Sequence, residues 1–186
     1  MDLNKIMLIN YKLLKTMCFV FLVCTACKSM NNSIEAQESS QAQIISCPEG
    51  WHCSFELLKN KGTKIQYDQF NYPYLTIEDG KSTVLVFKYQ RNEIEGTADS
   101  GYDEYIYLNI DDFQKNINLT DESLAEVDAT FRRMCFCTRE STGYFPVRKG
   151  HLKIKKINRN RFKIDFSFKL ETVPQVIENI NETIHY

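Results

Sequence analysis

Residues 162–170 read F-K-I-D-F-S-F-K-L, with an apolar residue at every second position. Side chains alternate between two faces along a strand, so this period predicts a strand with one face in a core and one in solvent. Leu152 and Ile154 begin the same alternation upstream, and the polar residues 158–160 supply a connection. We therefore expect an antiparallel hairpin over residues 151–170.

Further strands are expected on the N-terminal side of this hairpin. The stretch T-V-L-V-F-K-Y at residues 83–89 is apolar on both faces and β-branched at its start, which is typical of a central strand. Tyr105–Ile110 has the same character. Shorter strand candidates, separated by the turn signals Lys61-Gly62, Asn71–Pro73 and Asp79-Gly80, lie at residues 54–58, 63–67 and 74–77.

Helical signals are few. Thr120 followed by acidic residues predicts a short helical turn at 121–127, which gives way to a strand over 131–137. Val176, Ile180 and Ile184 recur every four residues and predict a short closing helix. The chain is therefore expected to be mainly β: an antiparallel β-sandwich or small barrel with one or two short helices.

The N-terminus has the order of a secretory signal. Lys12 and Lys15 precede the uncharged run Met17–Thr25, and small residues stand directly before Cys27. The apolar run is about nine residues long, whereas a helix that spans a bilayer needs roughly 20. We therefore expect residues 1–26 to be a cleaved signal peptide.

The segment V-C-T-A-C at residues 23–27 resembles the lipobox of bacterial lipoproteins. This resemblance implies a diacylglycerol on the Cys27 thiol and attachment of the mature chain to a membrane. In some of these lipoproteins an aspartate directly after the cysteine retains the protein at the inner membrane, so Lys28 at that position favours the outer membrane. An acidic run after the cysteine marks surface export in Bacteroidetes-type lipoproteins, and its absence here favours a periplasm-facing protein. The alternative is a soluble secreted protein cut after Ala26.

A wider resemblance links the chain to small lipoproteins of Bacteroidetes-type bacteria. It rests on the lipobox at Cys27, the C-x-C at residues 135–137, the turn Thr142–Phe145 and the hairpin that begins at Gly150. The resemblance implies no catalytic residues.

The sequence predicts three consecutive parts. Residues 1–26 are the signal, with translation starting at Met1 or Met7. A polar stretch follows, so residues 27–46 are expected to be the lipidated cysteine and a flexible linker. Residues 47–186 are rich in Phe and Tyr and long enough to bury a core, so we expect a single disulfide-stapled β-domain there.

The four remaining cysteines, Cys47, Cys53, Cys135 and Cys137, are an even number in an exported chain, which predicts two disulfides. Two cysteines separated by one residue on a strand share a face but lie too far apart to bond. We therefore favour bridges from both back to the Cys47–Cys53 segment, with the local pairs 47–53 and 135–137 as the alternative. Zinc ligation with His52 and His151 lacks the usual spacing, and a redox role lacks the C-x-x-C motif.

Other candidate sites carry weaker signals. The acidic loop from Glu93 to Glu104 contains two glycines and is a candidate calcium site without the EF-hand order. Loop and edge aromatics can stack on sugars or peptides, or plug the ends of a sandwich. The candidate ligand-binding residues are Trp51, Tyr72, Tyr74 and Tyr144.

The function predicted from the sequence is not catalytic. A net charge of −1 offers no basic field for nucleic acid, and the histidines lack the context of a nucleophile triad. We expect a cofactor-free, membrane-attached module that binds an envelope protein or a glycan or otherwise supports the envelope. A glycan- or peptide-binding module using the loop aromatics is the first alternative, and an unrecognised enzyme is the second.

Overall fold

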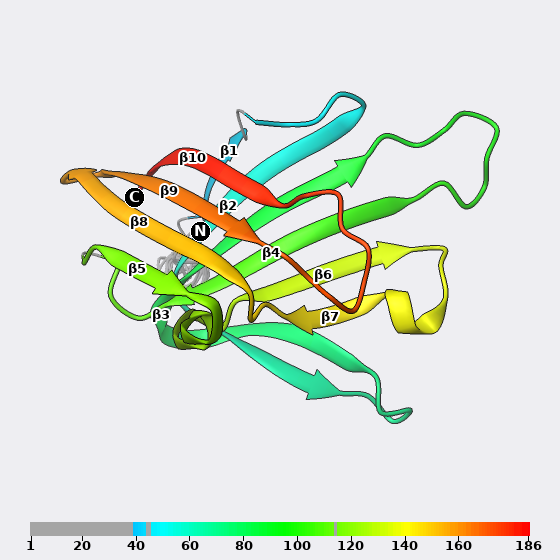
Figure 1. Cartoon of the computed structure of the whole chain (residues 1–186), viewed down its shortest axis with the longest axis horizontal. Helices are drawn as coiled ribbons and strands as arrows, with labels where there is room; N and C mark the ends of the chain where they lie inside the picture. Colours follow the sequence, from blue (N-terminus) through cyan, green and yellow to red (C-terminus); the bar gives the residue numbers. More distant parts are fainter. Residues whose placement is uncertain (1–38, 44–45, 114) are drawn as a thin grey trace, which may run out of the picture. The chain divides into compact units, whose positions relative to one another are not determined.

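Two antiparallel sheets pack face to face and enclose the core of the domain (Figure 1). The computed structural model describes residues 39–43, 46–113 and 115–186. The larger sheet has the order β1-β2-β3-β4-β6-β7: Ser39–Gln43, Trp51–Tyr67, Pro73–Arg91, Tyr102–Ile110, Thr130–Cys135 and Gly143–Pro146. The smaller sheet has the order β10-β9-β8-β5: Asn179–His185, Arg161–Phe168, Gly150–Asn158 and Ile117–Thr120. Two 3-10 helices, η1 (Asp121–Val127) and η2 (Arg139–Ser141), complete the described elements.

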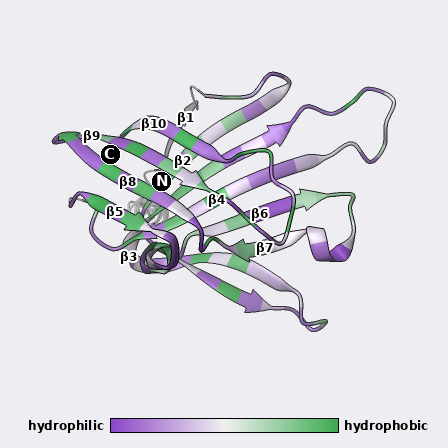
Figure 2. Cartoon of the chain, viewed as in Figure 1, coloured by the Kyte–Doolittle hydropathy of each residue, from purple (hydrophilic) through white to green (hydrophobic). Residues whose placement is uncertain are grey.

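This architecture confirms the predicted mainly β fold, and of the two forms expected it is the sandwich. The hairpin predicted over 151–170 is β8–β9, whose register pairs Leu152 with Phe166 and Ile154 with Ile164. Figure 2 shows the alternation of apolar and polar residues along these strands. The predicted helical turn at 121–127 is η1.

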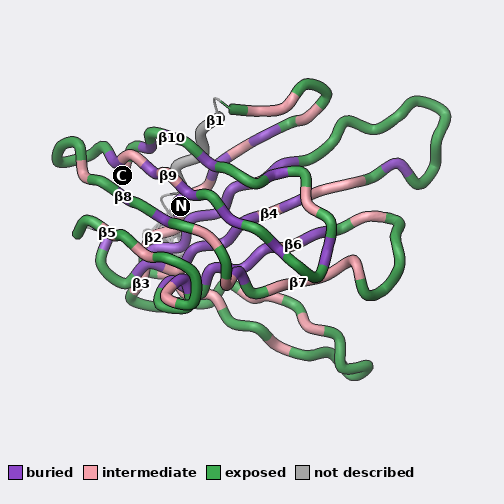
Figure 3. The backbone as a smooth tube through the Cα atoms, viewed as in Figure 1, coloured by how far each residue is buried: buried purple, intermediate pink, exposed green. Residues whose placement is uncertain are grey.

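The core lies between the inner faces of the two sheets. The larger sheet contributes Phe55, Phe87, Ile106 and Phe131, and the smaller contributes Leu152, Phe162, Ile164 and Phe166. The predicted central strand at 83–89 lies in β3, between β2 and β4, where Thr83 to Phe87 are all buried. Figure 3 shows this burial along the middle of the sheet and the exposure of the loops. No helix among the residues that the structure describes is long and apolar enough to cross a bilayer.

The predicted closing helix is wrong, because Asn179–His185 forms the edge strand β10 instead. Ile180, Glu182 and Ile184 all point inward and are buried, while the residues between them are exposed. The glutamate interrupts an apolar alternation, so the remaining isoleucines recur every four residues and imitate a helical period.

Part of the predicted linker also forms a strand. Ser39–Gln43 is β1, which pairs with β2 in the register Ser39↔Leu58 to Gln43↔Ser54. The outer edge of β2 offers backbone N–H and C=O groups, and a polar segment can pair with them through its own backbone. The composition of residues 39–43 does not indicate this pairing. The signal, Cys27 and residues 28–38 and 44–45 lie outside the described residues.

The favoured long-range disulfides are wrong as well. The bonded pairs are the local alternative, Cys47–Cys53 and Cys135–Cys137, with Cα–Cα distances of 5.7 Å and 5.2 Å. Cys135 is the last residue of β6, so the chain leaves the extended strand before Cys137. The turn brings two sulfur atoms together that a continuous strand would hold apart.

Candidate functional site

A hairpin arm, residues 62–78, projects from the larger sheet and bounds the candidate site. The ladder of β2 and β3 continues to the pair Tyr67↔Pro73, but it is interrupted where Lys61 pairs with both Ser82 and Asp79. This β-bulge bends the two strands, so the arm leaves the line of the sheet (the teal hairpin at the bottom of Figure 1).

Gly80 allows a close approach of the two strands at the bulge. A Cβ atom on Gly80 would lie 3.0 Å from the backbone nitrogen of Gly62 and 3.1 Å from the carbonyl carbon of Lys61. A side chain there would crowd the backbone of the partner strand, so a glycine suits this position. The turn signals predicted at 61–62 and 79–80 therefore mark one bend shared by two continuous strands.

The arm is amphipathic. Register pairs Ile65 with Leu75 and Tyr67 with Pro73, which places these four side chains on one face. The opposite face carries a polar network in which Tyr74 donates its hydroxyl hydrogen to Gln66 Oε1 at 3.0 Å. The Gln66 amide in turn donates to Glu78 at 2.8 Å and to Thr76 at 3.2 Å. The network leaves the apolar face as the part of the arm available to a ligand.

The tip of the arm has a defined shape. Asp68 Oδ1 accepts hydrogen bonds from the backbone amides of Phe70 and Tyr72, each at 2.8 Å, as in an Asx-turn. Phe70 is 67% exposed and Tyr67 is 63% exposed. The Arg139 guanidinium lies 3.8 Å from the centroid of the Tyr72 ring, which links the tip to η2.

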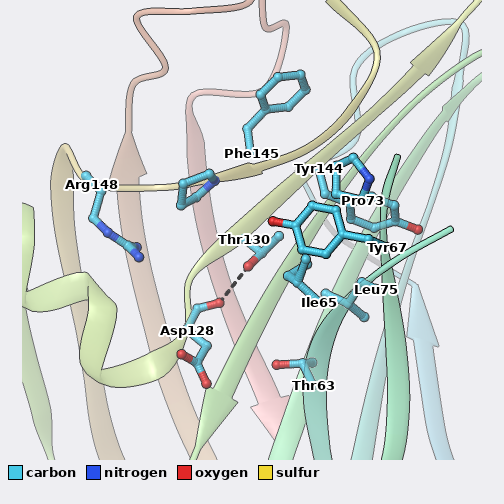
Figure 4. A pocket seen from close by; sticks show the side chains of 11 residues that line it. Thr63, Ile65, Tyr67, Pro73, Leu75, Asp128, Thr130, Tyr144, Phe145 and Arg148 are labelled. Carbon is cyan, nitrogen blue, oxygen red and sulfur yellow. Dashed lines mark hydrogen bonds between the residues drawn. The ribbon is translucent and has the colours of Figure 1, made fainter. Parts of the chain in front are cut away.

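Strand β7 forms the opposing wall. Its register pairs Tyr144 with Arg132 and Pro146 with Thr130, whose side chains face away from the smaller sheet. Phe145, between them, packs against the main core and in Figure 4 points away from the arm. Phe145 therefore offers the groove its backbone rather than its ring.

Two adjoining cavities of about 370 Å³ and 420 Å³ occupy the space between the arm and β7. Both are lined by Pro73, Tyr144 and Phe145, so they form one groove. In Figure 4 the ring of Tyr67 lies across the floor formed by Ile65 and Leu75. The polar residues at its margins are Thr63, Asp128, Thr130 and Arg148 in the first cavity and Asn71, Arg139, Glu140 and Thr142 in the second.

The floor of the groove continues into a second apolar cluster on the outer face of the larger sheet. Val84, Val86 and Tyr107 are buried there, and Leu75 and Tyr144 pack against them. The ring centroids of Tyr107 and Tyr144 are 6.4 Å apart. Burial, with the neighbouring Tyr144 phenol, raises the pKa of Tyr107.

Ion pairs border this cluster. Arg132 binds Asp103 at 2.5 Å, and Lys88 binds Glu56 at 2.5 Å. Burial raises the pKa of Asp103, although the Arg132 charge opposes that rise. The charged groups at this border are therefore paired with one another, beside the half-buried Tyr105 and Tyr144.

Of the four predicted ligand-binding residues, the structure brings Tyr72 and Tyr144 together in the groove. Tyr74 lies on the polar face of the arm. Trp51 lies elsewhere, half-buried against the core, with its ring edge-on to Tyr102 at 5.6 Å. The four aromatic residues therefore do not form one site: two lie in the groove and two lie outside it.

The acidic loop, the candidate calcium site, ends at a buried structural carboxylate, Glu104. Glu104 is fully buried and accepts hydrogen bonds from the Tyr102 hydroxyl at 2.6 Å and from the backbone amides of Val176 and Ile177 at 2.8 Å each. Arg133 donates to the same hydroxyl at 3.1 Å. Within the described part of the chain, no group of three or more His, Cys, Asp or Glu residues is placed to hold a metal ion.

Several groove residues were not predicted from the sequence, chiefly Ile65, Tyr67, Pro73 and Leu75. A signal for them exists: T-K-I-Q-Y and P-Y-L-T-I both alternate, so pairing them gives an apolar face in a hairpin. That this face lies outside the core depends on the bulge at Gly80, and the turn signals at 61–62 and 79–80 do not distinguish one bulge from two separate turns.

No protein-family model, curated protein or solved structure matches the chain. Its function is therefore inferred from the groove itself.

Proposed function

We propose that this chain is a lipid-anchored protein of the bacterial envelope whose β-domain binds an extended peptide segment of a partner protein. The observation that carries the proposal is the groove between the apolar face of the arm and β7. The anchor is Cys27, at the end of a signal-like segment, and the proposed location is the periplasmic face of the outer membrane.

An extended peptide fits the walls of the groove. β7 is the last strand of its sheet, and β3 pairs with β4 only from Thr83 onward, so the arm continues past the sheet as a two-stranded hairpin. A peptide laid beside such edges forms backbone hydrogen bonds, while its alternate side chains enter pockets. The rings of Tyr67 and Tyr144 and the prolines Pro73 and Pro146 supply those pockets.

A glycan fits less well. Sugar rings stack on aromatic residues but also need many polar partners for their hydroxyl groups. In the groove, Thr130 already donates to the Asp128 carbonyl oxygen at 2.8 Å, and Asp128 Oδ2 already accepts from Asn109 at 3.1 Å. The floor itself is apolar, so we assign the site to a peptide.

The test is selection from a random peptide library on the mature chain in detergent micelles, followed by calorimetry with the best peptide. Tyr67→Ala is expected to weaken binding about 10- to 30-fold, because loss of an aromatic anchor costs roughly 1.4–2 kcal/mol. Tyr74→Ala, on the polar face of the same arm, is the matched control and is expected to change the affinity less than about twofold.

Three results would contradict the proposal: no selected peptide, equal effects of the two variants, or binding confined to a glycan array. The last of these would move the site to the glycan alternative.

A further inference from the structure

The second disulfide lies in a different environment from the first. Cys53 is 3% exposed and belongs to the main core, so the Cys47–Cys53 bond joins the start of the domain to that core. Cys135 is half-buried at the end of β6, and Cys137 is exposed on the following turn. Phe136, between them, is 82% exposed.

The Cys135–Cys137 bond adds little to the fold. It joins residues only two positions apart, and in the chain-entropy model the stabilisation by a disulfide falls as the closed loop shortens. The following turn is held by hydrogen bonds: Arg133 Nη1 donates to the Ser141 carbonyl at 2.5 Å, and Thr142 Oγ1 donates to the Arg133 carbonyl at 3.0 Å. The Ser141 backbone amide also donates to the Thr138 carbonyl at 3.1 Å.

Accessibility favours thiol chemistry at this bond. Cys137 and Phe136 are exposed, and Cys135 is half-buried. Disulfide exchange begins when a thiolate attacks an accessible sulfur atom. An exposed bond that the fold does not need is typical of a labile rather than a structural disulfide.

We propose that Cys135–Cys137 is a thiol–disulfide exchange site that accepts two electrons from the dithiol of a partner protein, with Phe136 as the docking side chain. A partner thiolate attacks the exposed Sγ of Cys137, the disulfide breaks, and the Sγ of Cys135 leaves as a thiolate that takes up a proton. The second partner thiolate attacks the partner's sulfur in the mixed disulfide and releases Cys137. The partner ends as a disulfide and this chain as a dithiol.

The exchange site goes beyond peptide binding and does not depend on it. It also changes the interpretation of the sequence, in which the missing C-x-x-C motif argued against redox chemistry. The turn after β6 places a C-x-C pair in the exposed position that such chemistry needs.

The first experiment measures the two disulfides separately. The mature protein is equilibrated with graded ratios of reduced to oxidised dithiothreitol, quenched with acid, alkylated and analysed by peptide mass spectrometry, with circular dichroism in parallel. Cys135 and Cys137 are expected to become alkylated at ratios that leave Cys47–Cys53 intact and the spectrum unchanged. Opening of both bonds together, or of Cys135–Cys137 only with loss of the β spectrum, would overturn the proposal.

The second experiment captures the intermediate. A thioredoxin whose resolving cysteine is replaced by serine is expected to form a mixed disulfide at Cys137, identified by mass spectrometry. Phe136→Ala is expected to slow reduction by wild-type thioredoxin at least fivefold and to leave reduction by dithiothreitol unchanged. If Phe136→Ala slows reduction by thioredoxin and by dithiothreitol equally, Phe136 is not the docking side chain. Capture of the thioredoxin at Cys47 or Cys53 would refute the exchange site.

Discussion

Gly150 is the residue at which one added carbon is expected to be most damaging. Its φ is +145°, and a Cβ atom would lie 2.2 Å from the Ser167 carbonyl oxygen and 2.7 Å from the Phe168 Cα. Gly150→Ala therefore combines an unfavourable backbone conformation with a clash against β9. We expect the free energy of unfolding, measured by urea denaturation, to fall by about 2–5 kcal/mol.

Gly101→Ala is the control for this prediction. No heavy atom lies within 4 Å of a Cβ placed there, and the residue precedes β4 on the surface. Its effect is expected to stay within about 0.5 kcal/mol. Similar losses in the two variants would show that Gly150 does not lie against Phe168 as described.

Glu104 shows what local sequence conceals at the residue scale. Its place in the acidic stretch favoured a solvated or calcium-binding side chain, whereas the alternation with Ile106 and Leu108 in β4 turns it into the core. The amides that it accepts from are 72 and 73 residues away in sequence. Burial of a carboxylate is tolerated only with such partners, and nothing near Glu104 in the chain predicts them.

At the scale of elements, alternation predicted the strands that it filled without a break. Residues 162–168 of this alternation lie in β9, which pairs with β10 on one side and with β8 on the other. In β10 the same alternation holds, but a glutamate occupies one inward position. Hydrophobic patterning therefore failed where a core position is polar, because it does not recognise a carboxylate that is hydrogen-bonded inside.

Glu182→Ala tests the β10 assignment. Glu182 is 5% exposed and accepts the backbone N–H of Ser46 at 3.0 Å. Its removal leaves a donor without this acceptor, so we expect a loss of about 1–3 kcal/mol in the free energy of unfolding by urea denaturation. In a helix through Ile180 and Ile184, Glu182 would lie on the opposite, solvated face and its removal would cost almost nothing.

Thr183→Ala is the neighbouring control, since Thr183 is exposed in β10. We expect a change of at most about 0.5–1 kcal/mol from the lost β propensity. A larger effect at Thr183 than at Glu182 would reverse the inward and outward faces of the strand.

For the whole molecule, composition and strand spacing predicted the class of fold but not the site. Tyr72 and Tyr144 meet because the arm bends at Gly80 and β7 forms the edge of the same sheet, and these two features come from distant parts of the chain. Tyr74 is excluded because it alternates along β3 with Pro73 and Leu75, whose side chains line the groove. The disulfides illustrate the same limit, because their pairing depends on where β6 ends.

Attachment to the membrane is the last prediction at this scale. In the proposed mature protein, acyl chains on Cys27 each contribute roughly 0.8 kcal/mol per buried CH₂ group, and two or more are needed for stable anchoring. Cys27→Ser is therefore expected to move the chain from the detergent phase to the aqueous phase in Triton X-114 partition and to remove the acyl mass from its N-terminal peptide. Cys18→Ser changes a cysteine inside the signal and is expected to leave both properties intact. Detergent partition of a Cys27→Ser chain from which residues 1–26 are absent would mean that the lipid does not hold the protein at the membrane, and the lipid anchor would then be rejected.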